Sequence, residues 1–162
     1  MPVNKASSGI SSDIVWTFSH FNQLSAAEWY AISLARESVF IVEQKCAFLD
    51  ADGADTACWH LVGKVGEEIA AYCRVVPPGL KYVEPSIGRV ITTPKFRTRG
   101  FGKTLLSEAL KRCDTMFSGL PNRIGAQMYL ENFYASFGYM TTSAFYEEDG
   151  IMHVEMVRRC ES

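Results

Sequence analysis

Apolar residues recur along this chain with two different periods, and the longest stretch with a helical period lies at residues 101–117. Its apolar side chains are one, three or four positions apart: Phe101, Leu105, Leu106, Ala109, Leu110, Cys113, Met116 and Phe117. This spacing places them on one face of an α-helix, which has about 3.6 residues per turn. The pattern therefore predicts an amphipathic helix that packs its apolar stripe against a sheet.

The N-terminal part of the chain predicts a strand followed by a helix. Residues 14–18 (IVWTF) are β-branched and aromatic, which is typical of a strand. Ser25 and Glu28 form the sequence signature of a capping box, in which each side chain binds the backbone amide of the other residue. A helix is therefore expected from Ser25 to about Arg36 or Phe40.

Shorter apolar or alternating segments predict the remaining elements. Strands are expected at residues 59–65, 69–76, 86–92, 123–128, 142–146 and 151–158, and a short helix is expected at residues 129–137. The resulting order, β-α-β-β-β-α-β-α-β-β, predicts an α/β (α+β) fold with a mixed sheet and helices on both faces. No repeat or Gly/Ser-rich linker interrupts this order, so residues 13–162 are expected to form one domain.

Composition narrows the class of protein. The chain has 162 residues, of which 48% are hydrophobic and 21% charged, and a formal net charge of -2. A chain of this length can bury enough surface to fold without disulfides or a structural metal. Proteins that bind nucleic acid or anionic membranes depend on clustered Lys and Arg, and no such cluster occurs here. We therefore expect neither partner.

The cysteines and the N-terminus predict a cytoplasmic protein. The five cysteines are scattered and include no CxxC pair, which favours reduced thiols over a disulfide framework. Residues 1–12 are polar and small, so they predict a flexible tail rather than a signal or transit peptide. No apolar run approaches the roughly 20 residues that a membrane-spanning helix needs.

The segment at residues 94–104 (PKFRTRGFGKT) is the strongest candidate for a ligand site. It connects a predicted strand to the predicted helix at 101–117, so its backbone amides lie at the positive end of that helix. Gly100 and Gly102 allow an anion to approach these amides, and Arg97, Arg99 and Lys103 add positive charge. The segment predicts a phosphate or pyrophosphate site, with an ordinary turn carrying solvated basic residues as the alternative.

Two common nucleotide motifs do not fit this segment. A Walker A loop needs a glycine where Arg97 stands. A dinucleotide fingerprint needs a third glycine where Leu105 stands and an acidic residue near Leu120. A nucleotide-binding protein of either kind is therefore disfavoured.

The same segment resembles a known superfamily. Residues 97–102 (RTRGFG) match the [RQ]-x-x-G-x-[GA] loop of the GNAT-superfamily N-acetyltransferases, and residues 134–139 (YASFGY) resemble their Y-x-x-x-G-[FY] segment. Gln127 stands seven residues before Tyr134, where relatives often have Asn. Further segments, among them FIVEQKC, SIGRV and NFY, resemble the ElaA-like branch of the superfamily. The resemblance implies a single GNAT-type domain with a mixed, largely antiparallel central sheet of six to seven strands.

The resemblance also implies a donor substrate and the residues that bind it. Acetyl-CoA is expected to place its pyrophosphate on the amides of residues 99–104 and its pantetheine arm along the edge of a strand. The implied cofactor-binding residues are Val90, Ile91, Thr92, Arg97, Thr98, Arg99, Gly100, Phe101, Gly102, Lys103, Thr104 and Gln127. Tyr134 matches the general acid that protonates the departing thiolate, a role that suits a phenol because it is protonated at neutral pH.

The general base is not assigned by the resemblance. Many relatives carry a Glu on the strand before the loop, at the position of Ser86. An acceptor ammonium must lose a proton before it attacks, so Glu43, Glu84, His60 and His153 are considered, with Glu43 and His60 as tentative choices for a base or an acceptor-site residue. Arg89 and His153 are candidates for the acceptor site; Arg89 either holds an acceptor carboxylate or pairs with Glu43.

A metal site is not expected. Residues 50–55 (DADGAD) resemble a calcium loop, but the glycine and the final Glu are misplaced, so we interpret them as a turn that lines the acceptor entrance. Neither tight zinc-ligand spacing nor a signature for a Cys nucleophile at Cys46 or Cys58 occurs. Acidic residues in this turn and at 147–149 hint at a cationic acceptor.

The predicted phosphate site and the family resemblance together imply an acetyl-CoA-dependent N-acetyltransferase. It is expected to transfer an acetyl group directly to a primary amine of an unidentified small molecule or peptide in a ternary complex, as a monomer or homodimer. The alternative is a non-catalytic acyl-CoA-binding or sensing module, which the missing Glu at position 86 favours.

Overall fold

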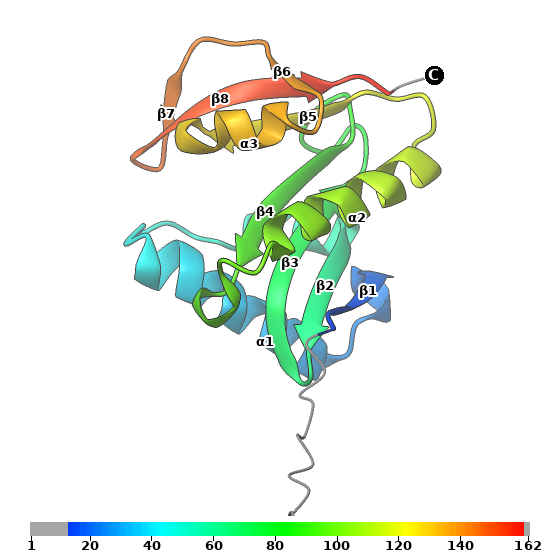
Figure 1. Ribbon diagram of the computed structural model, residues 1–162, viewed down its shortest axis with the longest axis vertical. Helices are drawn as coiled ribbons and strands as arrows, with labels where there is room; N and C mark the ends of the chain where they lie inside the picture. The colour runs from blue at the N-terminus through cyan, green and yellow to red at the C-terminus, as the bar shows by residue number, and fades with distance from the viewer. Residues whose placement is uncertain (1–12, 161–162) are drawn as a thin grey trace, which may run out of the picture.

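The computed structural model describes residues 13–160, which form two four-stranded antiparallel sheets and three α-helices (Figure 1). The first sheet has the strand order β1-β2-β3-β4, and in the second β8 pairs with β5, β6 and β7. The strands are β1 (Val15–His20), β2 (Trp59–Val65), β3 (Glu68–Val76), β4 (Ser86–Thr92), β5 (Asn122–Gln127), β6 (Tyr139–Thr141), β7 (Tyr146–Glu148) and β8 (Ile151–Arg158). The helices are α1 (Ala26–Glu37), α2 (Phe101–Met116) and α3 (Glu131–Ala135).

Helix α1 begins where the capping box predicts. The Ser25 hydroxyl accepts from the Glu28 amide at 3.1 Å, and the Glu28 carboxylate accepts from the Ser25 amide at 2.9 Å. The chain then continues into a π-helical segment, η2 (Ser38–Glu43). This extension carries Phe40 and Glu43 beyond the end of α1, next to the pockets described below.

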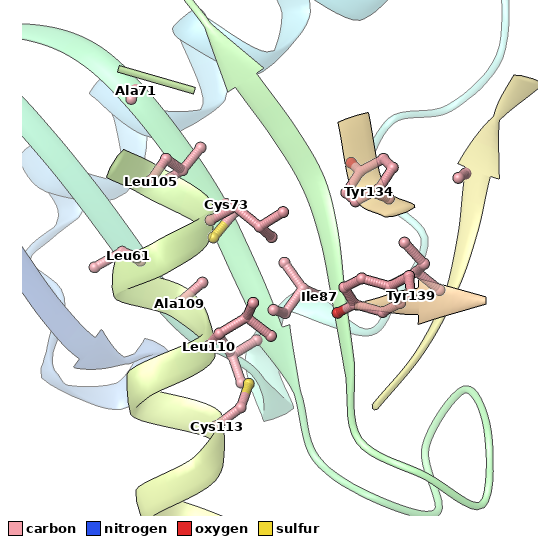
Figure 2. Close-up of a cluster of buried hydrophobic side chains, with 14 of the residues drawn as sticks. Leu61, Ala71, Cys73, Ile87, Leu105, Ala109, Leu110, Cys113, Tyr134 and Tyr139 are labelled. Carbon is pink, nitrogen blue, oxygen red and sulfur yellow. The ribbon is translucent and has the colours of Figure 1, made fainter. Parts of the chain in front are cut away.

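Helices α1 and α2 cover opposite faces of the first sheet (Figure 1). Alternate residues of β2 and β3 supply the two cores, because successive side chains of a strand point to opposite faces. Leu61 and Cys73 pack with the apolar stripe of α2, as Figure 2 shows, whereas Val62 and Tyr72 pack with Ile32 of α1. The helix predicted at 101–117 is thereby confirmed, with its last residue at 116, and so is its apolar face.

The second sheet packs onto the same core as α2. Ile124, Tyr139, Val154 and Met156 of this sheet belong to the cluster that contains Leu110. The Tyr139 hydroxyl, which is buried, donates to Asn122 Oδ1 at 2.6 Å. The two sheets meet where the Arg123 amide donates to the Pro85 carbonyl at 3.0 Å. Beyond that contact β4 and β5 are not paired, so an edge of β4 stays open.

The predicted fold class is confirmed, and three details differ. The strands number eight within residues 13–160 and form two sheets, where one sheet of six to seven strands was expected. The strand expected at 142–146 is wrong, because the chain pairs with β8 at 139–141 and again at 146–148. The short helix expected at 129–137 is limited to 131–135 and follows a 3-10 turn, η5 (Met128–Leu130).

Some expectations concern residues outside this description. Residues 1–12, for which the sequence predicts a flexible tail, lie outside the described residues, so the division into that tail and a domain at 13–162 stays a prediction. Among residues 13–160, none of the helices combines the length and apolar character required to cross a membrane.

Candidate active site

Three neighbouring pockets lie between the two sheets and share lining residues. The loop pocket, about 370 Å³, lies beside β4 and the start of α2 and includes Glu43, Val90, Ile91, Thr92, Arg97, Gly102 and Tyr134. The central pocket, about 140 Å³, includes Gly88, Arg89, Val90, Gln127, Tyr134 and His153. The hairpin pocket, about 240 Å³, includes Phe40, Asp50, Arg89, Gln127, Glu148 and His153. Gln44 lines all three pockets. The central pocket also shares residues with each of the other two, so the three pockets form a row from the start of α2 to the β7-β8 hairpin.

The N-terminus of α2 has the local geometry that the predicted anion site requires. Gly100, the N-cap residue, has φ 77°, a left-handed conformation that glycine adopts without strain, and a side chain at this position would meet no atom within 4 Å. No side chain caps the helix and its first turn carries no acidic residue. The Thr104 amide bonds to the Gly100 carbonyl at 3.3 Å, so the amides before it are available for a ligand.

Side chains around this loop hold it in place. The Arg99 guanidinium lies 5.5 Å from the ring centroid of Phe96 and 5.1 Å from that of Phe101. The Thr104 hydroxyl donates to the Gly100 carbonyl at 3.3 Å, and the Thr98 hydroxyl donates to the Arg97 carbonyl at 2.6 Å. Thr98 and Thr104 therefore use their hydroxyls within the loop, and the Thr104 amide binds the Gly100 carbonyl as well, so the predicted contribution of Thr104 to an anion site is not supported.

Arg97 and Glu43 form a two-pronged ion pair at the loop pocket. The guanidinium nitrogens lie 2.7 and 3.0 Å from the two carboxylate oxygens, and Arg97 Nε donates to the Thr92 carbonyl at 3.2 Å. Both side chains are 39% exposed. Glu43, a tentative base, therefore shares its carboxylate with Arg97, a predicted cofactor-binding residue, and the predicted pairing of Glu43 with Arg89 is wrong.

Strand β4 carries a bulge at the central pocket. On β3, Arg74 lies opposite Gly88 of β4 and Tyr72 lies opposite Ile91 of β4. Between these two pairs, two residues of β4 (89 and 90) oppose one residue of β3 (73). One of the two, Arg89, has φ 53°. A bulge leaves backbone groups unpaired and bends its strand. Val90 lines the central and loop pockets, so the open edge of β4 faces the space in which a donor arm is expected.

Tyr134 lies where the central and loop pockets meet. It is 6% exposed and packs edge-to-face against Phe133 and Tyr139, with ring centroids 5.3 and 5.8 Å away. Figure 2 shows its hydroxyl on the side of the ring nearer β4. Burial raises the pKa of Tyr134 above its ordinary value, so the phenol stays protonated at neutral pH.

Gln127 and His153 form a cross-strand pair at the junction of the central and hairpin pockets. The Gln127 side-chain amide donates to Gln44 Oε1 at 3.5 Å. His153 Nδ1 lies 2.7 Å from the Ile151 carbonyl oxygen, and its ring stacks on Tyr146 with an interplanar angle of 25°. Both residues thus lie between the two ends of the row of pockets.

The other predicted base residues lie elsewhere. His60 has 0% exposure, contacts the Tyr72 hydroxyl at 2.7 Å and the Asp55 carbonyl at 3.0 Å, and lines none of the three pockets. Burial lowers its pKa, which favours a neutral core histidine. Glu84 pairs with Arg123 at 3.1 Å, away from the row of pockets. The structure therefore does not bring His60 or Glu84 to the site.

The acidic turn at 50–55 belongs to a network of ion pairs that the sequence does not reveal. Asp55 accepts from Arg36 at 2.7 Å and from Arg74 at 2.9 Å, and these two arginines are 1% and 2% exposed. Asp50 binds Arg36 and Arg89, and Asp52 binds Arg74 and Lys81. Asp50 and Asp52 of the turn line the hairpin pocket, and guanidinium groups bind their carboxylates; that this turn lines the acceptor entrance stays a prediction.

Of the two cysteines considered as nucleophiles, Cys46 lines the hairpin pocket, whereas Cys58 is buried and lines none of the three pockets. Burial raises the pKa of the Cys58 thiol to about 11, which keeps it protonated at neutral pH. In the described part of the chain, no group of three or more His, Cys, Asp or Glu side chains is arranged to hold a metal ion.

The fold that carries this bulged strand edge and uncapped helix N-terminus is the GNAT acyl-CoA N-acyltransferase fold. Residues 59–160 match the family model described as an acetyltransferase (GNAT) domain, and the chain belongs to this family. Protein ElaA of Escherichia coli is 37% identical over 90% of this chain and 96% of its own length. The resemblance to this superfamily and to its ElaA-like branch is thereby confirmed, and the chain is an acyltransferase by family.

Solved structures agree with this assignment. The crystal structure of Escherichia coli ElaA has a TM-score of 0.86 with this chain at 36% identity and covers 91% of this chain and 100% of that one. An acyl-CoA N-acyltransferase from Pseudomonas aeruginosa has a TM-score of 0.87 at 32% identity, with coverages of 90% and 99%. A GNAT family acetyltransferase from Elizabethkingia anophelis with acetyl-CoA bound has a TM-score of 0.62 at 15% identity, with coverages of 92% and 99%, and shows the fold alone.

Proposed function

We propose that this protein is an acetyl-CoA-dependent N-acetyltransferase that transfers the acetyl group directly to a primary amine in a ternary complex. The observation that carries the proposal is the row of pockets. One end opens beside the start of α2, where the anion site is proposed, the other opens at the β7-β8 hairpin, and both reach the central pocket. Two substrates that enter from opposite ends would meet beside Tyr134, so no acyl-enzyme is needed.

The loop pocket fits acetyl-CoA. The amides of residues 99–103, which precede the bonded Thr104 amide, and the charge of Arg99 and Lys103 suit its pyrophosphate. The open edge of β4 at residues 90–92 offers backbone groups to the amide-containing pantetheine arm, as an exposed sheet edge does to a peptide. Ile91 is buried under α1, so its contribution would come from the backbone alone. The bound acetyl-CoA of the Elizabethkingia anophelis structure supports this choice of donor.

Tyr134 is the proposed general acid. When the acceptor nitrogen forms its bond to the thioester carbon and the carbon–sulfur bond breaks, the thiolate needs a proton. A buried, protonated phenol at the junction of the loop and central pockets is placed to give one. A backbone amide at the β4 bulge would polarise the thioester carbonyl.

Donor binding is tested by thermal unfolding with acetyl-CoA, CoA and ATP. A ligand that binds only the folded protein raises its melting temperature. We expect a rise with both CoA species and none with ATP. In the Gly100→Glu variant the rise should disappear, because the new carboxylate lies at the anion site and the residue must adopt a positive φ. Wild-type-like binding by that variant would contradict the assigned pyrophosphate site.

The role of Tyr134 is tested by Tyr134→Phe, which keeps the ring and removes the hydroxyl. Loss of a general acid slows turnover by about 10²–10⁴-fold. Acetyl-CoA affinity should stay within about twofold, because the hydroxyl is not part of the proposed anion site. Tyr139→Phe is the matched control, since that hydroxyl binds Asn122 inside the core and lines none of the three pockets. Equal turnover by wild type and Tyr134→Phe would remove Tyr134 from the mechanism.

A non-catalytic acyl-CoA-binding or sensing module is the second candidate. Ser86 is buried at the position where many relatives carry a Glu, so β4 supplies no carboxylate there. This module would bind acetyl-CoA without amine-dependent CoA release. Assays with spermidine, 2-phenylethylamine and a tripeptide with a free N-terminus separate the two, since only the enzyme releases CoA at a rate that depends on the amine.

Other features of the proposal remain predictions. They are a cytoplasmic location, a monomeric or homodimeric state, and the absence of nucleic-acid and metal partners. Size-exclusion chromatography with light scattering tests the oligomeric state directly.

A further inference from the structure

The proposed reaction requires a proton acceptor that the family resemblance does not supply. A primary amine is mostly an ammonium ion at neutral pH, and it must lose a proton before its nitrogen can attack. Of the four residues considered from the sequence, His60 and Glu84 lie outside the row of pockets. Glu43 binds Arg97 through both carboxylate oxygens. His153 is the remaining candidate, and it lines the central and hairpin pockets.

The tautomer of His153 follows from its hydrogen bond. Nδ1 lies 2.7 Å from the carbonyl oxygen of Ile151, and a carbonyl oxygen can only accept. The proton of the neutral imidazole is therefore on Nδ1. The lone pair is then on Nε2, which is the atom free to take a proton from a substrate.

The surroundings of His153 suit the imidazolium that would result. Nε2 lies 3.9 Å from Glu148 Oε2, close enough for the carboxylate to stabilise a positive ring. Tyr146 stacks on the ring, with centroids 5.9 Å apart, and fixes its plane. The other charged groups that line the pockets around His153 are Arg89 and Asp50, which pair with each other, Lys81 and Asp52, which pair with each other, and Asp149 in the hairpin turn. The side chain is 12% exposed, so it lies at a pocket wall and not on the open surface.

We propose that His153 is the general base of this acetyltransferase, an inference that rests on the proposed function. Nε2 accepts a proton from the acceptor ammonium, which leaves a neutral amine. The amine lone pair forms the nitrogen–carbon bond as the carbon–sulfur bond breaks, and the thiolate takes the Tyr134 proton. The proton still carried by the new amide nitrogen restores the phenol through solvent, and His153 releases its own to solvent. Overall, ammonium and acetyl-CoA give amide, CoA and one proton.

The inference is tested by the pH dependence of kcat/KM for His153→Asn. The Asn side-chain amide can still donate to the Ile151 carbonyl, so the hairpin keeps that bond while the proton acceptor is lost. We expect kcat/KM to fall by about 10²–10⁴-fold at neutral pH and the decline on the acidic side of the profile to disappear. Acetyl-CoA affinity should stay within about twofold. Imidazole added to His153→Ala should restore part of the rate, which a structural role would not explain.

Two further variants complete the design. His20→Asn makes the same substitution at a histidine outside the pockets, where Nδ1 accepts from the Asn22 amide, and its profile should match that of wild type. Glu148→Gln should lower kcat/KM by several-fold and keep the acidic limb. A His153→Asn enzyme that retains the wild-type acidic limb would overturn the inference alone. A wild-type protein that binds acetyl-CoA but acetylates none of the three amines would instead contradict the proposed function.

Discussion

The buried ion pairs beneath the hairpin pocket make Asp55 the most informative position for stability. Its carboxylate contacts the guanidinium groups of Arg36 and Arg74, and all three side chains are buried. Burial raises the pKa of Asp55, but the two arginines outweigh this effect, so the pKa is lowered and the carboxylate is charged at neutral pH. Asp55→Asn keeps the shape of the side chain and removes its charge.

The expected loss of stability follows from the arginines left behind. Removal of one partner from a buried ion pair costs about 3–5 kcal/mol, because a charge stays buried without compensation. In this variant Arg36 still pairs with Asp50, and Arg74 still pairs with Asp52. We therefore expect the free energy of unfolding to fall by the lower end of this range, about 3 kcal/mol. For a domain of this size, that corresponds to a drop of about 6–12 °C in the melting temperature.

Asp114→Asn is the matched control for this prediction. Asp114 also pairs with an arginine, Arg158, at 3.1 Å, but its side chain is 37% exposed. An exposed ion pair contributes about 0–1 kcal/mol. Urea unfolding and calorimetry of both variants measure the difference. If Asp55→Asn lost no more stability than Asp114→Asn, the view that the acidic turn is a structural anchor would be refuted.

Two further predictions follow from the site. Glu43→Gln should release Arg97 from its ion pair and tighten acetyl-CoA binding by up to about fivefold. The limit follows because an exposed ion pair contributes about 1 kcal/mol or less. A 100-fold loss of turnover in this variant would instead identify Glu43 as the base. The lowered pKa of His60 means that the unfolded chain binds more protons below about pH 6.5. The free energy of unfolding should therefore fall as the pH drops below that value, by at most about 1.4 kcal/mol per pH unit. A His60 ring that NMR titration finds protonated in the folded protein at pH 6.5 would contradict this.

The elements that the sequence predicts correctly are those with local causes. The capping box at Ser25 and the apolar stripe of α2 each depend on residues within a few turns of one another. The positions of strands β6 and β7 are instead determined by their pairing with β8. Met140 is exposed, and Tyr146 is placed by its pairing with His153. Side-chain alternation therefore could not locate these strands.

The residues of the candidate site also fall into those that local sequence predicts and those that strand pairing places. The anion loop was identifiable because Gly100, Gly102 and the basic residues are neighbours in the sequence. The bulge at Arg89 was not, since it reflects the register between β3 and β4 and occurs at a residue other than glycine. The position of His153 beside Gln127 also follows from strand pairing, here between β5 and β8.

The ion-pair network changes what the acidic residues imply about the acceptor. In the sequence, Asp50 and Asp52 add to the acidic residues at 147–149 and favour a cationic acceptor. In the structure both aspartates bind arginines, so they add little negative potential to the hairpin pocket. Its wall also includes the apolar side chains of Phe40, Ile41, Phe48, Leu49 and Ile151. Selection among amines should therefore depend more on the apolar part of the acceptor than the sequence implies, which is why 2-phenylethylamine is tested beside spermidine.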